Sequence, residues 1–156
     1  MFLMSSEDIE MTTFTIGFTE KPAERFFLLL REAGVKSLLD VRLNNTSQLS
    51  GFAKRDDLKF FLREICEISY REVKDLAPSK LILADYQKGT LDWNRYEDLY
   101  LNELSKRSVE RLVEKDWFDQ GCLLCSEHKP HFCHRRLAVE YLNKHWEQRL
   151  SIKHLF

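Results

Sequence analysis

Alternation between strand-forming and helix-forming segments constrains the fold of this chain more than any other feature. Residues Met11–Gly17 are rich in β-branched and aromatic side chains and end at a glycine, which predicts a strand. Pro22 suits a first helical turn, and apolar residues then recur at helical spacing until Gly34, a typical stop signal. Val35–Val41 is short and largely apolar, as a strand covered on both faces would be. This order predicts the beginning of a parallel sheet.

The remainder of the chain continues this alternation after a polar loop. Residues 42–54 are expected to form a loop at the carboxyl end of the second strand, a place where long loops often carry function. Further helices are predicted at Asp56–Ile65, Leu81–Tyr86, Arg95–Leu104, Val109–Val113 and His134–Gln148, and further strands at Ile68–Glu72, Gly121–Ser126 and Ile152–Leu155. The pattern predicts an α/β fold, a three-layer sandwich in which helices flank a mainly parallel sheet.

Length and composition narrow the class of protein. A chain of 156 residues can bury one sizeable core, so we expect a single domain over residues 1–156, with residues 1–11 as a candidate disordered segment. The net charge of −1 provides no basic field for non-specific binding to duplex nucleic acid. Because no apolar run approaches the roughly 20 residues that span a bilayer and no export signal is recognisable, we expect a cytoplasmic protein without membrane contact. The four cysteines are accordingly expected to be reduced thiols.

Polar residues stand at the ends of several predicted strands. Gly17 ends the first strand, Asp40 and Arg42 lie at the end of the second, and Cys125 and Glu127 follow the late strand. Ligands of parallel α/β sheets bind beyond the carboxyl ends of the strands, so these residues are expected to surround one crevice. Asp40 and Arg42 are two residues apart and share a strand face, where they can form a charge-assisted pair. That pair belongs either to a functional site or to a structural ion pair beneath the loop.

The segment that opens the last long helix is a second candidate. If this helix begins near Cys133 or His134, its first backbone N–H groups and its dipole favour an anion, and Arg135 and Arg136 add positive charge. The same field would lower the pKa of the Cys133 thiol and make it a candidate nucleophile, with His134 as a candidate general base. An inert, half-buried cysteine at a helix start is the alternative.

These considerations assign a role to each candidate site residue. We predict catalytic roles for the potential nucleophile, base and acids Cys133, His134, Glu127 and Asp40. We predict ligand-binding roles for the residues that offer backbone, cation or thiol contacts: Gly17, Arg42, Cys125, Arg135 and Arg136. The sequence leaves open whether the protein is an enzyme.

A metal site is a further possibility, because residue types that bind zinc occur at Cys122, Cys125, His128, Cys133 and His134. A zinc knuckle needs its Cys-x2-Cys pair on a turn, whereas Leu123 and Leu124 place this pair inside an apolar strand that points the two side chains to opposite faces. The expectation is therefore that the protein holds no metal and no other cofactor.

Several ordered motifs resemble one known family. Thr15-Ile-Gly-Phe18, Asp40-Val-Arg42, and Leu124-Cys-Ser-Glu127 followed by Cys133-His-Arg135 are similar to motifs of the family called domain of unknown function 488. The resemblance extends from about Thr13 to Leu142. It implies a compact α/β fold with a polar pocket formed by these motifs, and it implies no particular activity.

Two classes of function remain open for this pocket. The first is an enzyme or binding protein for a small anionic or phosphate-bearing ligand such as a nucleotide or nucleoside. The second is a nucleic-acid-binding or accessory module, with Lys54, Arg55, Arg135 and Arg136 in a groove and with Phe18, Phe52, Tyr70 or Trp93 stacking on bases. A further possibility, which does not use the pocket, is a partner-binding scaffold that uses the helical stretch Leu76–Lys115. The sequence gives no indication of the oligomeric state.

Overall fold

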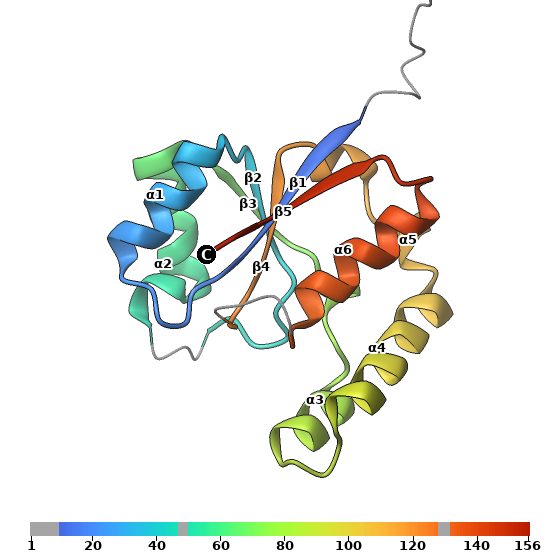
Figure 1. The fold of residues 1–156 in the computed structure, drawn as a ribbon. Helices are drawn as coiled ribbons and strands as arrows, with labels where there is room; N and C mark the ends of the chain where they lie inside the picture. Colours follow the sequence, from blue (N-terminus) through green and yellow to red (C-terminus); the bar gives the residue numbers. More distant parts are fainter. Residues whose placement is uncertain (1–9, 47–49, 128–131) are drawn as a thin grey trace, which may run out of the picture.

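A computed structural model describes residues 10–46, 50–127 and 132–156 (Figure 1). Five strands form one sheet in the order β3-β2-β4-β1-β5, and every neighbouring pair is parallel. The strands are β1 (Met11–Gly17), β2 (Ser37–Asp40), β3 (Ser69–Glu72), β4 (Gly121–Cys125) and β5 (Leu150–Leu155). The α-helices are α1 (Ala23–Ala33), α2 (Arg55–Phe61), α3 (Lys80–Gln87), α4 (Trp93–Arg107), α5 (Val109–Leu112) and α6 (His134–His145). The predicted α/β fold with a mainly parallel sheet is confirmed.

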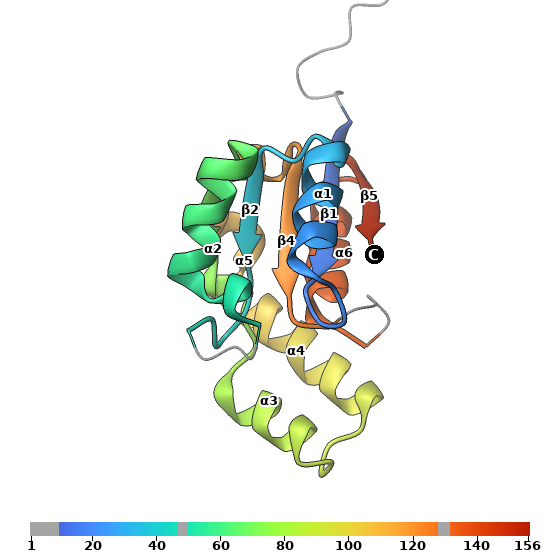
Figure 2. The same cartoon turned by 90° about the vertical axis from the view of Figure 1, so that its left-hand side faces the viewer.

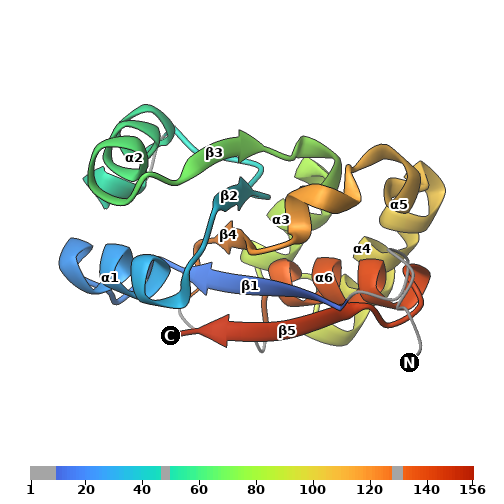
Figure 3. The ribbon, with the colours of Figure 1, turned by 90° about the horizontal axis from the view of Figure 1, so that it is seen from above.

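Helices cover both faces of this sheet, as Figure 3 shows from above. Because successive side chains of a strand point to opposite faces, each central strand contributes to two apolar layers. Leu38 and Leu124 pack toward α1 and α2, whereas Leu39 and Leu123 pack toward α4 and α6. This double burial explains why the two central strands are almost continuously apolar in sequence.

The three central strands end at one edge of the sheet. Gly17 of β1 pairs with Cys125 of β4, and Asp40 of β2 pairs with Leu124 of β4. In Figure 2 the arrowheads of these strands point toward α3 and α4, which lie beyond this edge. The chain reverses here before α1, α2 and α6, so the loops after the three strands gather at the same place.

Element boundaries differ from the sequence-based expectation in several places. The helix expected at Asp56–Ile65 is α2 followed by one wide π-helical turn over Leu62–Cys66. The last long helix ends at His145 rather than Gln148, and α1 ends before Gly34, which adopts the left-handed conformation expected of a helix stop. Helix stops therefore agree with the sequence best where a glycine provides them.

Two regional expectations fall partly outside the described residues. The candidate disordered segment 1–11 lies outside them up to residue 9, and Met11 already belongs to β1. His128, considered as a zinc ligand, also lies outside the described residues. Within 10–46, 50–127 and 132–156, no helix has both the length and the apolar character that crossing a membrane requires.

Candidate functional site

A pocket of about 240 Å³ opens at the carboxyl edge of the sheet. One wall comes from the strand ends and the start of α6: Arg42, Leu43, Asn44, Cys125, Ser126, Glu127, Cys133 and His134. The opposite wall comes from α3, α4 and the residue before Cys133: Leu83, Tyr86, Gln87, Trp93, Tyr96 and Phe132. The structure thus brings five of the predicted site residues to one pocket, namely Arg42, Cys125, Glu127, Cys133 and His134.

Asp40 and Arg42 form a buried, two-pronged ion pair at the end of β2. The Arg42 Nε and Nη2 atoms donate to the two carboxylate oxygens of Asp40 at 2.8 and 2.9 Å, and the backbone N–H of Arg42 donates to the same carboxylate at 3.1 Å. Arg42 also donates to the carbonyl of Ala53 at 2.7 Å and lies over the ring of Phe18. Asp40 is fully buried and Arg42 is 4% exposed. These contacts fit the structural alternative, in which the pair holds the loop 42–54 against β2.

A polar network surrounds the far side of the Asp40 carboxylate. The Tyr70 hydroxyl donates to Asp40, and the Asn45 side-chain amide donates to Glu72 at 2.6 Å and to Asp40 at 3.4 Å. Burial and the Asp40 charge raise the pKa of Tyr70, because both disfavour a phenolate there. Asp40 therefore has its lone pairs occupied and does not line the pocket. Its catalytic role stays a prediction that these contacts do not favour.

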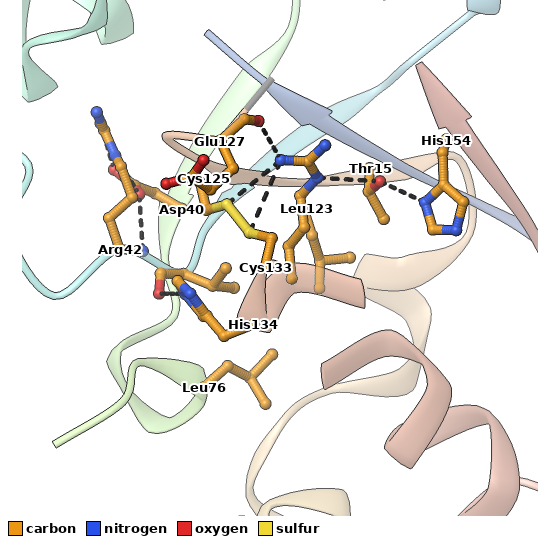
Figure 4. Close-up of a disulfide and its surroundings, with 12 residues drawn as sticks. Thr15, Asp40, Arg42, Leu76, Leu123, Cys125, Glu127, Cys133, His134 and His154 are labelled. Carbon is orange, nitrogen blue, oxygen red and sulfur yellow. Dashed lines mark hydrogen bonds and ion pairs between the residues drawn. A yellow bond between two sulfur atoms is a disulfide. The ribbon is translucent and has the colours of Figure 1, made fainter. Parts of the chain in front are cut away.

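The expectation of reduced cysteines is wrong for two of the four. Cys125, the last residue of β4, and Cys133, immediately before α6, form a disulfide (Figure 4). Both side chains are buried, at 1% and 3% exposure. Cys66 and Cys122 are free thiols. The expectation rested on cellular compartment and on the absence of an export signal, and neither argument concerns the distance between two sulfurs that the fold brings together.

This disulfide changes how the Cys133 prediction applies. Cys133 occupies the N-cap position of α6 and makes no side-chain capping hydrogen bond. In the oxidised state it has no thiol to ionise, so a lowered thiol pKa can be a property of the reduced protein alone. The nucleophilic role of Cys133 remains a prediction for that reduced state.

The side chain of Arg135 is fully buried beneath the disulfide. Its Nη1 lies 3.3 Å from the Cys125 sulfur and 3.8 Å from the Cys133 sulfur, and also donates to the backbone carbonyl of Glu127. Its Nε donates to the Thr15 hydroxyl at 3.3 Å. Burial lowers the pKa of Arg135 to about 10, which leaves the guanidinium charged at neutral pH. Arg135 does not line the pocket, and the ligand-binding role predicted for it stays a prediction.

Thr15 connects Arg135 to β5. Since the Thr15 oxygen accepts from Arg135, its own hydroxyl hydrogen is available to His154 Nδ1, which lies 2.7 Å away. Figure 4 shows Thr15 and His154 on one side of the disulfide and Asp40 and Arg42 on the other. The sequence analysis did not predict these linked hydrogen bonds from Arg135 through Thr15 to His154. They exist because β5, at the end of the sequence, pairs with β1 near its beginning.

Gly17 has a structural reason to be glycine. A Cβ atom built on Gly17 would lie 1.4 Å from the carbonyl oxygen of Glu127 and 2.8 Å from Nη1 of Arg135. The chain leaving β4 therefore crosses directly over the end of β1, and only the absence of a side chain permits this approach. Gly17 makes room for the segment that carries Glu127, and the ligand-binding role predicted for it stays a prediction.

His134 is the first residue of α6 and lines the pocket. Its Nε2 lies 2.8 Å from the carbonyl oxygen of Val41, and since a carbonyl can only accept, Nε2 carries a proton. Burial lowers the pKa of His134 to about 4, so the ring is neutral at physiological pH with its lone pair on Nδ1. A neutral imidazole at this position can accept a hydrogen bond, and the role of general base stays a prediction.

Glu127 and Arg136, also predicted from sequence, lie at different distances from the pocket. Glu127 is exposed and lines the pocket, so its carboxylate can accept hydrogen bonds from a ligand. Arg136 forms an ion pair with Glu140, one turn later on α6, at 3.0 Å, and it does not line the pocket. Arg136 therefore contributes charge to the helix start without facing the crevice.

One group of side chains among the described residues has ligand types that could hold a metal ion: Cys125, Cys133 and His134, whose candidate atoms lie within 4.8 Å of one another. The disulfide removes both thiolates as ligands in this state. The Arg135 guanidinium lies close to both sulfurs, and its positive charge disfavours a cation beside them. Cys122 packs on the α1 side of the sheet, away from Cys125, as the strand period predicts.

Of the aromatic wall, the sequence indicated Trp93, as one of four residues that could stack on bases, but it did not indicate Tyr86, Tyr96 or Phe132. Trp93 stacks with Tyr96 at a ring separation of 5.3 Å, and Tyr86 packs against both. Phe132 meets Trp93 edge to face and is 61% exposed. Trp93 and Tyr96 look like ordinary packing residues in sequence. Their helical spacing is the available signal, and it cannot reveal that the helix they start lies across the carboxyl edge of the sheet.

A comparison with family models found one match. The model described as Domain of unknown function DUF488 matches residues 22–142. This range includes the Asp40-Val-Arg42 and Leu124-to-Arg135 motifs and begins after the Thr15-to-Phe18 motif. No curated protein and no solved structure matched the chain.

Proposed function

The chain belongs to the DUF488 family, and we propose that its pocket binds a small ligand that combines a planar ring with a negatively charged group, of the nucleoside or mononucleotide class. The observation that carries the proposal is the pairing of two unlike walls. Trp93, Tyr86 and Tyr96 offer aromatic surface on one side, and the start of α6 faces the same space from the other. A ligand that satisfies both walls needs a ring and an acceptor group.

The ring half of the ligand is supported by the aromatic wall. Base stacking on an aromatic side chain contributes about 1–3 kcal/mol per base and tolerates different bases. Glu127, on the opposite wall, can accept hydrogen bonds from sugar hydroxyls or from an exocyclic amine. Pockets for drug-sized ligands usually exceed about 300 Å³, so a volume of about 240 Å³ favours one nucleoside unit over a dinucleotide.

The anionic half of the ligand is supported by the start of α6. The N-cap residue Cys133 provides no side-chain acceptor to the first turn, and both Cys133 and His134 line the pocket. Backbone N–H groups and the dipole at a helix start favour a phosphate or carboxylate. Arg135, buried behind this turn, adds positive charge without occupying the pocket.

The nucleic-acid alternative has less support. Of the four aromatic residues considered for base stacking, Trp93 lines the pocket, whereas Phe18 is buried under Arg42 and Tyr70 donates to Asp40. Arg55, considered for a basic groove, is paired with acidic neighbours. These contacts occupy Phe18, Tyr70 and Arg55, three of the groups considered for that groove.

The proposal is tested by comparing four ligands in a thermal-shift assay: a nucleoside monophosphate, its nucleoside, the matching sugar phosphate and inorganic phosphate. A ligand that binds the folded state alone raises apparent stability. The monophosphate is expected to raise the melting temperature most, because it alone satisfies both walls. No shift with any nucleoside or nucleotide would refute the proposal.

A pair of tryptophan variants locates the binding. Trp93→Ala removes the stacking surface and should weaken monophosphate binding by roughly 5- to 150-fold, the equivalent of about 1–3 kcal/mol. Trp117→Ala is the matched control, because Trp117 contacts Arg71 and does not line the pocket. Equal affinity losses in the two variants would place the ligand elsewhere.

A further inference from the structure

The two bonded sulfurs lie at the bottom of the pocket and come from separate elements. Cys125 ends β4 and Cys133 precedes α6, and both side chains line the pocket although they are almost fully buried. A small molecule that enters the pocket can therefore meet the disulfide.

A fixed positive charge lies beside both sulfurs. The Arg135 guanidinium is held by the Thr15 hydroxyl and the Glu127 carbonyl, and its Nη1 is 3.3 Å from Cys125 and 3.8 Å from Cys133. A cation at this distance favours a thiolate and disfavours the neutral thiol. Opening the disulfide would thus create negative charge where the protein already holds a positive one.

From this geometry we propose that Cys125 and Cys133 form a thiol–disulfide exchange centre for small thiols. An incoming small thiolate attacks the Cys133 sulfur, the bond between the two cysteines breaks, and Cys125 leaves as a thiolate beside Arg135. A second small thiolate attacks the small-molecule sulfur of the mixed disulfide and releases Cys133. Two small thiols are oxidised to one small disulfide, and the protein disulfide is reduced to two thiols by the same two electrons.

We assign the direction of attack from the distances of the two sulfurs to Arg135, because the full charge of a guanidinium exceeds the partial charge that the start of α6 places near Cys133. A thiol with a lower pKa leaves faster in disulfide exchange, and Arg135 lies closer to Cys125 than to Cys133. Cys125 is therefore the leaving sulfur and Cys133 is the sulfur that carries the mixed disulfide. In the reverse reaction Cys125 attacks that mixed disulfide and restores the bond.

The test uses the full chain in buffers of reduced and oxidised glutathione, quenched by acid and alkylated, with peptide masses reporting each cysteine. The Cys125–Cys133 bond is expected to open and re-form as the ratio of the two glutathione forms changes. In Cys125→Ser, glutathione should accumulate on Cys133, because no second cysteine remains to displace it. In the unsubstituted protein, any trapped mixed disulfide should carry glutathione on Cys133. A bond that never opens or never forms, or a mixed disulfide of the unsubstituted protein found on Cys125, overturns the proposal.

The contribution of Arg135 has its own readout. In reduced protein, Arg135→Met should raise the pH midpoint of Cys125 alkylation by about 1–3 units, the usual effect of losing an adjacent opposite charge. Arg135→Lys keeps the charge and should raise this pH midpoint less. It keeps the test usable if the methionine variant does not fold. An unchanged midpoint in a folded Arg135→Met protein would contradict the electrostatic argument. None of these measurements requires a nucleotide, so they can refute the proposed exchange centre without bearing on the proposed nucleotide binding.

Discussion

Replacing Asp40 with asparagine should destabilise the protein more than any other single polar change at this edge of the sheet. Asp40 accepts hydrogen bonds from three nitrogen atoms of Arg42, from the Tyr70 hydroxyl and from the Asn45 amide. Asp40→Asn keeps the size of the side chain, removes its charge and turns one acceptor into a donor. The Arg42 guanidinium, 4% exposed, would keep one side-chain oxygen at position 40 and the Ala53 carbonyl as acceptors, but it would lose its charged partner.

The size of this effect follows from the burial of both partners. Removing one member of a buried ion pair costs about 3–5 kcal/mol, because the other charge stays out of water without a partner. Domains are usually stable by about 5–15 kcal/mol, so a loss of this size removes roughly a fifth or more of the total. For a domain of this size, about 1 kcal/mol corresponds to roughly 2–4 °C, which predicts a fall in melting temperature of roughly 6–20 °C.

The assay is urea unfolding followed by circular dichroism, with Glu64→Gln as the control. Glu64 pairs with Arg63 at 2.9 Å, but both side chains are more than half exposed, so this change should stay within about 1 kcal/mol. The double variant Asp40→Asn with Arg42→Met should recover part of the loss, since it removes the unpaired charge. An Asp40→Asn protein as stable as the control variant would refute the buried-pair argument.

Two further changes test the geometry of the site. Gly17→Ala forces its new methyl group against the Glu127 carbonyl and should lower the free energy of unfolding by about 1–3 kcal/mol. Gly51→Ala is the control, because a methyl group there meets open space and should change the free energy little. Similar losses of stability in the two variants, measured by urea unfolding, would contradict the close approach at Gly17. The pKa of His134 is lowered from 6.5 to about 4 in the folded protein, so the unfolded chain binds the proton first and stability should fall as the pH drops from 6.5 toward 4. His134→Gln should reduce that fall, and an unchanged profile of melting temperature against pH would show that His134 is not its source.

The disulfide between Cys125 and Cys133 could not be predicted from the expected cellular compartment. An expectation about the cellular compartment concerns the surroundings of the protein, whereas a disulfide depends on two sulfurs reaching each other. The sequence places Cys133 eight residues after Cys125, with the end of a strand before the intervening segment and a helix after it. Nothing in that spacing fixes the path of the segment, so the return of Cys133 to the end of β4 is a tertiary outcome.

The sequence by itself determined the fold class and the edge at which the site lies. Apolar periodicity distinguishes strands from helices, and in a parallel sheet every strand presents its carboxyl end to the same edge, so Gly17, Asp40 and Cys125 had to end near one another. Only the tertiary structure decided what each residue does there. In that structure Arg135 is buried beside the disulfide, Arg42 forms an ion pair with Asp40, and Trp93 lines the pocket. Local patterns fix the period and direction of each element, whereas the distance between side chains of different elements is set by how those elements pack.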